Sequence, residues 1–322
     1  MAPLVTHSEI KAFAEDRVNL PATKAAAHRV QVNGLRDRLK KKIDDDPSYG
    51  VVKMLHAGSV AKGTALQDVH DLDAAVYVKT IEAPNGGDAQ LVPWLADRLF
   101  EANTNMSREQ FVENPHCVTV SYKGSGLDVD VVPVLYEDEA EDRGYLVRKN
   151  TGDRVLTSIT LHLQFLRQRK NKYGPSYAEL IRLTKWWKRT VTYRDEDFRF
   201  KSFMIELLWA KLADEGLTLT DYPTALERFF AYIVRTDLGE QVYFTDFYKA
   251  SQIPKRSSSA VEVLDPVNTE NNVGVLYDTS DRNRIVSAAQ HALNAISEAR
   301  FAPTKGRAVE CWQVVLGPTF KG

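Results

Sequence analysis

Residues 58–73 contain two groups of side chains that suit phosphoryl chemistry. A glycine turn, Gly58-Ser59-Val60-Ala61-Lys62-Gly63-Thr64, is followed by Asp71-Leu72-Asp73. Glycine lets the backbone approach a phosphate closely, and a serine hydroxyl can hydrogen-bond a phosphate oxygen. If residues 72–78 form a strand, Asp71 and Asp73 point to the same face. Two such carboxylates repel each other unless a cation lies between them, and hard oxygen ligands suit Mg²⁺ or Mn²⁺.

A third carboxylate of the same kind lies further along the chain. Residues 116–136 alternate apolar and polar side chains around Gly124-Ser125-Gly126, a pattern typical of a β-hairpin. Asp128 and Asp130 share one face of the return strand, where an unpaired carboxylate would be costly to bury. A turn or an Asp-x-Asp pair alone usually has no catalytic role. The combination on three successive strands predicts a two-metal site.

The charge of the chain is balanced. Its 322 residues include 42 basic and 43 acidic side chains, a formal net charge of −1. Proteins that grip a nucleic-acid polymer usually carry a basic excess, so the composition favours free nucleotides as partners. Cys117 and Cys311 lie too far apart to indicate a zinc motif or a disulfide framework. With no signal peptide or membrane-spanning stretch in the sequence, we expect a cytoplasmic protein without a membrane partner.

The elements that must position these residues follow from hydrophobic periodicity. Buried strands are expected at 51–57, which leads into the glycine turn, and at 72–78, with a helix near 89–102. From about residue 153 the period becomes helical, with helices near 156–171, 176–191, 201–215, 223–238 and 280–300. Residues 137–152 form an expected surface connection, and 249–274 a long loop. We expect an N-terminal helical arm (1–45), a catalytic lobe (46–152) and a helical lobe (153–322), with the nucleotide cleft between the lobes.

These motifs resemble those of a known superfamily. The order GS-xxx-GT, DxD, then Asp followed by Val-Val-Pro is similar to polymerase-β-type nucleotidyltransferases. Residues 179–188 (ELIRLTKWWK) resemble the helix with the phosphate-binding lysine in oligoadenylate synthases and cyclic GMP-AMP synthase. Residues 264–274 (LDPVNTENNVG) resemble the oligoadenylate-synthase-type C-terminal domain. Residues 17–39 and the tail 312–320 (WQVVLGPTF) resemble bacterial cGAS-like enzymes, the CD-NTases of CBASS anti-phage defence.

The resemblance implies a fold and a set of site residues. The expected fold is α+β, a polymerase-β-like lobe with a mixed sheet packed against an oligoadenylate-synthase-type helical lobe. The implied metal ligands are Asp71, Asp73 and Asp130, holding two Mg²⁺ or Mn²⁺ ions, with Asp128 as a supporting partner. The implied nucleotide-binding residues are Gly58, Ser59, Lys185, Ser202 and Phe203.

Three of these assignments have structural alternatives. A lysine on an amphipathic helix, such as Lys185, is commonly a solvated side chain. Ser202 could instead cap a helix and Phe203 could belong to the core. Phe203 stands where eukaryotic relatives have tyrosine, so base stacking is retained without the phenolic hydrogen bond.

The implied function is template-independent synthesis of a cyclic or short linear oligonucleotide from nucleoside triphosphates, with release of pyrophosphate. The substrates would be ATP, GTP or pyrimidine nucleotides. The alternatives are an RNA 3′-end nucleotidyltransferase and a catalytically dead scaffold. The expected partners also include an operon-encoded regulator or a conjugating enzyme that acts at Gly322, because glycine offers least obstruction to carboxyl activation. An ordinary chain end is the alternative for Gly322.

Overall fold

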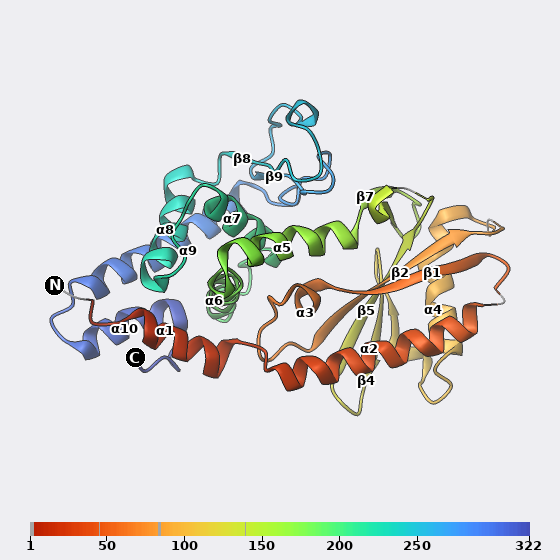
Figure 1. Ribbon diagram of the computed structural model, residues 1–322, viewed down its shortest axis with the longest axis horizontal. Coiled ribbons are helices and arrows are strands. Elements are labelled where there is room, and N and C mark those ends of the chain that lie inside the picture. The colour runs from red at the N-terminus through yellow and green to blue at the C-terminus, as the bar shows by residue number, and fades with distance from the viewer. Residues whose placement is uncertain (1–2, 45, 83–84, 139) are drawn as a thin grey trace. The chain divides into compact units, whose positions relative to one another are not determined.

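Figure 1 shows a computed structural model of the chain, which describes residues 3–44, 46–82, 85–138 and 140–322. The chain forms two compact units. The sheet unit is Leu20–Gln164, and the helical unit combines the segment up to Asn19 with Phe165–Gly322. These two compact units divide the chain at other points than the three parts expected from the sequence. The three-part division remains a prediction.

The sheet unit is built on a mixed sheet with the strand order β1-β2-β5-β4-β3, extended by β6 on β5 and by β7 on β6. β1 and β2 are antiparallel, β2 and β5 are parallel, and β4 and β5 are antiparallel. The strands are β1 (Tyr49–Ala57), β2 (Asp71–Thr80), β3 (Phe111–Glu113), β4 (Val118–Tyr122), β5 (Leu127–Leu135), β6 (Gly144–Val147) and β7 (Arg154–Thr157).

One face of this sheet forms the larger core of the unit. Apolar side chains of β2 and β5, including Leu72, Val129 and Val131, share a cluster with α2 (Ala22–Ile43) and α4 (Leu91–Glu101). Side chains alternate between faces in a strand, so the aspartates at odd positions of β2 and at even positions of β5 lie on the opposite face. Figure 1 shows the long α2 running beside the sheet. Short helical segments complete the unit: α3 (Gly58–Lys62) and 3₁₀ turns at Gly87–Gln90, Arg108–Gln110 and Ala140–Asp142.

The helical unit encloses an aromatic core. Trp187, Trp209, Phe229 and Phe230 are fully buried, and Trp209 stacks on Phe229 with ring centroids 4.7 Å apart. The helices are α1 (His7–Phe13) with the π-turn Ala14–Val18, α6 (Pro175–Thr192), α7 (Ser202–Asp214), α8 (Tyr222–Thr236), α9 (Thr279–Arg300) and α10 (Lys305–Leu316). A small sheet pairs β8 (Gln241–Val242) with β9 (Glu262–Val263), and Ala250–Gln252 is a 3₁₀ turn. α5 (Ile159–Tyr173) belongs partly to each unit.

Most elements expected from periodicity are present, with three differences. The strand expected to be buried, β1, is an edge strand and only half-buried along most of its length. The expected surface connection contains β6, and the sequence interpretation did not include α10. The expected loop at 249–274 is held by Asp265, which is buried, accepts a hydrogen bond from the Val267 amide at 2.8 Å and accepts another from the Asn271 side chain at 3.1 Å. The Asp-Pro…Asn-Asn-Val motif therefore stabilises the conformation of this segment through hydrogen bonds of Asp265.

Candidate active site

The glycine turn lies directly against one of the aspartates. Gly58 begins α3 with φ +62°, and a Cβ placed on it would lie 1.6 Å from Oδ2 of Asp73. Only glycine fits this position, because any side chain would meet the carboxylate and strain the left-handed backbone. The turn closes where the Thr64 amide donates to the Ser59 carbonyl at 2.8 Å. The backbone thus brings the Ser59 segment beside Asp73.

The four aspartates face each other in register on two neighbouring strands. In the parallel pair β2–β5, Asp71 is opposite Asp128 and Asp73 is opposite Asp130. Paired strands lie about 4.8 Å apart, so these carboxylates occupy a small area on the sheet face opposite the larger core. The expected grouping of Asp71, Asp73 and Asp130 is thus present in the backbone.

Asp130 is positioned by residues that the sequence interpretation missed. The Thr119 hydroxyl donates to Oδ1 of Asp130 across the β4–β5 pair. The same hydroxyl oxygen accepts a hydrogen bond of 2.8 Å from the Asn114 side chain. Threonine opposite aspartate in an antiparallel pair is a signal that becomes visible only once the register is known.

The electrostatics of the cluster favour a cation. The pKa of Asp71 is raised by burial and by the charges of Asp130 and Asp128, against a lowering contribution from His70. Burial, together with the charge of Asp130, raises the pKa of the Cys117 thiol to about 11. Oxygen ligands crowded in this way fit a hard divalent ion. The carboxylate oxygens are not gathered around one point: among the described residues, no group of three or more His, Cys, Asp or Glu is arranged as a metal-ligand set.

Lys185 has a different environment from the one expected for a phosphate ligand. In α6 it is only 6% exposed, and its ammonium lies 2.7 Å from Oε1 of Glu206, which is 2% exposed. Glu206 is in α7, so the pair joins the two helices inside the helical unit. This placement does not favour a contact between Lys185 and a triphosphate.

Lys188, three residues further along α6, is better placed. Its Nζ lies 3.5 Å from the Ser202 hydroxyl, at the start of α7. Its pKa is lowered by burial and by the nearby charge of Lys185. Ser202 is not the helix cap, because Lys201 occupies the N-cap position, and Phe203 is half-buried. Lys188 stands in the same sequence segment as Lys185, and helix periodicity alone does not distinguish them.

Two side-chain pairs connect α6 and α7. The outer pair, Lys188 with Ser202, is half-buried, and the inner pair, Lys185 with Glu206, is buried. Residues three and four apart in a helix share a face, which explains why both pairs form together. These residues belong to the helical unit, whereas Gly58, Ser59 and the aspartates belong to the sheet unit. Each set is defined within its own unit.

The glycine turn, the aspartates in register on a mixed sheet and a separate helical unit define a nucleotidyltransferase of α+β fold. Residues 4–153 match the family described as Second Messenger Oligonucleotide or Dinucleotide Synthetase domain. The cyclic AMP-AMP-AMP synthase of Escherichia coli strain MS 115-1 is 45% identical over 99% of this chain and 98% of its own length. A CBASS oligonucleotide cyclase, CdnC of E. coli strain KTE188, is 28% identical over 98% of each chain.

Solved structures agree with this assignment. The structure of E. coli MS115-1 CdnC with ATP matches with a TM-score of 0.90 at 44% identity, over 99% of this chain and 100% of the other. The structure of CdnC from the same strain in complex with HORMA-deltaN matches with a TM-score of 0.89 at 45% identity, over 99% of both chains.

The chain therefore belongs to the family of second messenger oligonucleotide or dinucleotide synthetases. It is a nucleotidyltransferase of the CBASS oligonucleotide cyclase class, as the sequence motifs predicted. The family and the fold class expected from the sequence are confirmed. Among the described residues, no helix is long and apolar enough to cross a membrane.

Proposed function

We propose that this enzyme joins three molecules of ATP into cyclic AMP-AMP-AMP and releases three pyrophosphates. The observation that carries the choice of product is the 45% identity, over nearly the full length of both chains, to a synthase named for that product. The solved complex of CdnC with ATP supports ATP as the substrate. GTP and pyrimidine nucleotides, which the sequence left open, are therefore expected to give no product.

We propose Asp71, Asp73 and Asp130 as the ligands of two divalent ions, Mg²⁺ or Mn²⁺. When bound, such ions activate an attacking hydroxyl and neutralise the leaving pyrophosphate. The side chains provide the rest: Thr119 fixes the orientation of Asp130, and Gly58 allows the backbone to pass beside Asp73. The residues already lie in register, so rotation about their side-chain bonds would bring the carboxylate oxygens together around a cation.

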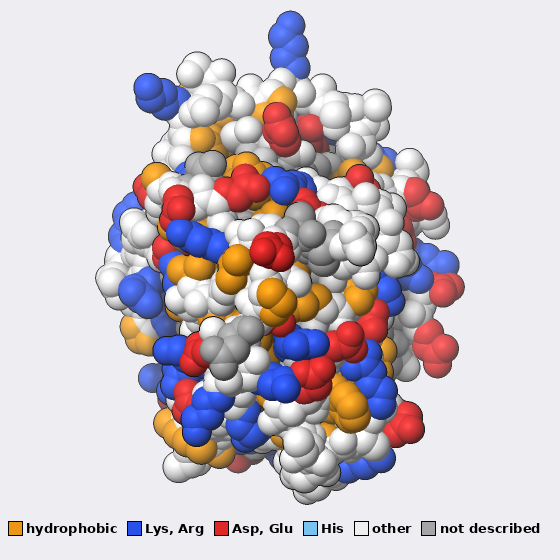
Figure 2. All heavy atoms as spheres, turned by 90° about the vertical axis from the view of Figure 1, so that its right-hand side faces the viewer, with side chains coloured by type: hydrophobic (Ala, Val, Ile, Leu, Met, Phe, Trp, Pro, Cys, Tyr) orange, Lys and Arg blue, Asp and Glu red, His pale blue; other side chains and the backbone are white. Residues whose placement is uncertain are grey.

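We assign the triphosphate contacts to Ser59, Lys188 and Ser202, and base stacking to Phe203. Lys188 replaces Lys185 in this assignment because the Lys185 ammonium is already paired with Glu206. A held triphosphate is pre-oriented for in-line attack, which lowers the entropic part of the barrier. The balance of 42 basic and 43 acidic residues favours a free nucleotide over an RNA substrate, and Figure 2 shows the two kinds of side chain intermixed on the face that it draws.

The test is to incubate the protein with each nucleoside triphosphate, Mg²⁺ or Mn²⁺ and then a phosphatase, and to identify the resistant product by mass spectrometry. ATP alone should give cyclic tri-AMP. Asp73→Asn should reduce product formation by at least about 10³-fold, whereas Asp128→Asn should retain partial activity. A product with another base or ring size would overturn the proposed product, and full activity in Asp73→Asn would overturn the metal site.

We propose a HORMA-domain protein as the regulatory partner, because CdnC of E. coli MS115-1 was solved in such a complex. Co-elution of the two purified proteins in size-exclusion chromatography tests this. Conjugation through Gly322 would require the tail to leave the surface, since Phe320 is buried and its carbonyl accepts a hydrogen bond of 2.9 Å from Gln313. The expected location remains the cytoplasm, where the nucleotide substrates are present.

A further inference from the structure

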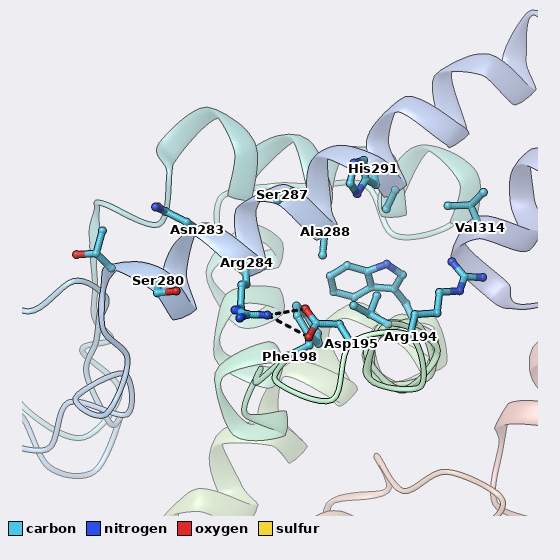
Figure 3. Close-up of a pocket in the computed structure, with 14 residues that line it drawn as sticks. Arg194, Asp195, Phe198, Ser280, Asn283, Arg284, Ser287, Ala288, His291 and Val314 are labelled. Carbon is cyan, nitrogen blue, oxygen red and sulfur yellow. Dashed lines mark hydrogen bonds and ion pairs between the residues drawn. The ribbon is translucent and has the colours of Figure 1, made fainter.

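The helical unit contains a cavity of about 730 Å³ that the proposed function does not use. It lies where the C-terminal turn of α6 and the segment after it face α9, as Figure 3 shows. Its apolar lining comes from Trp187, Val191, Phe198, Ala288, Ala292 and Val314. A volume in this range is typical of sites for drug-sized molecules.

The cavity results from small side chains on one face of α9. This helix packs against α8 and α10, and Ala288 and Ala292 face the cavity at a spacing of one helical turn. The cavity opens to solvent, because Asn283, Ser287 and His291 on its rim are exposed, and buried side chains such as Trp187 and Ala292 form its floor. Trp187 on the floor makes edge-to-face contacts with Phe198, Phe200 and Phe230, which hold its ring in place.

An ion pair holds the two walls of the cavity together. The Arg284 guanidinium on α9 lies 3.0 Å from both carboxylate oxygens of Asp195, in the segment that follows α6. In Figure 3 the dashed lines of this pair cross from one wall to the other. The space is therefore preformed, and an incoming ligand would not have to separate packed helices.

The charge of the cavity is positive. Its lining includes Arg194, Arg284 and Asp195, which sum to one positive charge with the exposed His291 neutral. Since Asp195 is engaged by Arg284, the charge that remains is that of Arg194. Arg194 is exposed and makes no ion pair within the described residues. Figure 3 shows it near Val314, away from Asn283 and Ser280.

We propose that this cavity is an effector site for a small planar aromatic anion. The apolar lining, which includes the rings of Trp187 and Phe198, suits an aromatic ring, and Arg194 supplies the partner for the negative group. An occupant would contact Trp187 and Val191, which belong to the turn of α6 that carries Lys188. Its binding therefore changes the use of ATP, a consequence that rests on the proposed role of Lys188.

Binding is tested with 8-anilinonaphthalene-1-sulfonate on the full-length protein, followed by fluorescence titration. The uncharged N-phenyl-1-naphthylamine is the matched ligand. Ala288→Phe fills the cavity and should raise the Kd of the anion by at least about tenfold. Arg194→Glu should raise it about fivefold and remove the preference for the anion. Arg228→Glu, an exposed arginine of α8 outside the cavity, is the control and should leave the Kd unchanged.

The effect on function is measured as the apparent KM for ATP with and without saturating anion. We expect a shift of at least about twofold in the wild type and in Arg228→Glu, and none in Ala288→Phe. If neither Ala288→Phe nor Arg194→Glu weakens binding of the anion, the proposed site is wrong. If the anion binds at this site but the apparent KM for ATP does not change, the proposed effector role is wrong. Arg194→Glu alters an exposed side chain, so the site remains testable if Ala288→Phe does not fold. Lack of any cyclic product would contradict the proposed function and leave the binding result standing.

Discussion

At the scale of single residues, the two lysines of α6 differ in their surroundings more than in their sequence. Lys185 is buried against Glu206, whereas Lys188 is half-buried beside the Ser202 hydroxyl. A buried ion pair stabilises the fold little in net terms, but removal of one partner leaves an unpaired charge in a low-dielectric interior. Lys185 thus supports the structure, and Lys188 is available to a ligand.

Substitutions at these lysines should separate the two roles. Lys185→Met should lower the free energy of unfolding by about 3–5 kcal/mol, because the buried Glu206 carboxylate loses the ammonium that lies 2.7 Å from it. The double variant Lys185→Met/Glu206→Gln should recover much of that loss. Lys188→Met should leave unfolding nearly unchanged and raise the KM for ATP while lowering kcat. Urea unfolding and steady-state kinetics measure both effects; equal stability losses at the two positions would contradict the assignment.

The inner pair should also affect the pH dependence of activity. Burial and the Lys185 charge lower the pKa of Lys188, so this ammonium loses its proton at a lower pH than an ordinary lysine. Activity that needs the charged form is present below this lowered pKa and declines as pH rises through it. Lys185→Met removes the repulsion from the Lys185 charge, so the alkaline decline of kcat/KM should move to higher pH. A profile unchanged by this variant would exclude Lys188 as the titrating group.

At the scale of elements, the β2–β5 pairing explains why the aspartates form one cluster. Period-2 alternation could predict from the sequence that Asp71 and Asp73 lie on one face of their strand, and that Asp128 and Asp130 lie on one face of theirs. It could not predict that the two strands are parallel neighbours with Asp73 opposite Asp130, because strand order and register depend on the whole sheet. For the same reason Thr119 was not foreseen as the partner of Asp130.

The contact of α3 with β2 makes Gly58 a sensitive position. Gly58→Ala would place a Cβ on the Asp73 carboxylate and strain a backbone at φ +62°, so product formation should fall by at least about tenfold. Gly124→Ala is the control, because a Cβ there has nothing within 4 Å. The assay is cyclic product formed per minute at saturating ATP. Activity lost equally in both variants would point to a general effect on folding.

At the scale of the whole molecule, the sequence patterns predicted a strand-rich part and a helical part. They predicted the boundaries of the two compact units less well. Helical periodicity identified α6 to α9, which are 13 to 22 residues long. β6 and β7 have only four residues each, too few for a period-2 pattern to stand out, and α10, with 12 residues, is shorter than α6 to α9. The membership of residues up to Asn19 in the helical unit depends on contacts with segments more than 150 residues away, such as Asn19 with Glu179, which local patterns do not encode.

Both ends of the chain pack into the helical unit. Phe13 of the N-terminal segment contacts Phe320 edge to face, with ring centroids 5.4 Å apart, and both rings are buried. Lys305 of α10 pairs with Glu9 and with the Leu4 carbonyl. Because the two rings contact each other directly, their contributions to the free energy of unfolding should be coupled.

Phe13→Ala and Phe320→Ala should each destabilise the protein by about 3–5 kcal/mol, through lost burial and the cavity that remains. Since each substitution already removes the shared ring contact, the double variant should lose less than the sum of the two single losses, by about 0.5–1.5 kcal/mol. Phe301→Ala serves as the control, because that ring is 80% exposed and should contribute little. Urea unfolding of the wild type, the two single variants and the double variant measures the coupling. If the losses at Phe13 and Phe320 are simply additive, the two ends are anchored independently, and release of the Gly322 tail would not require any change at the N-terminus.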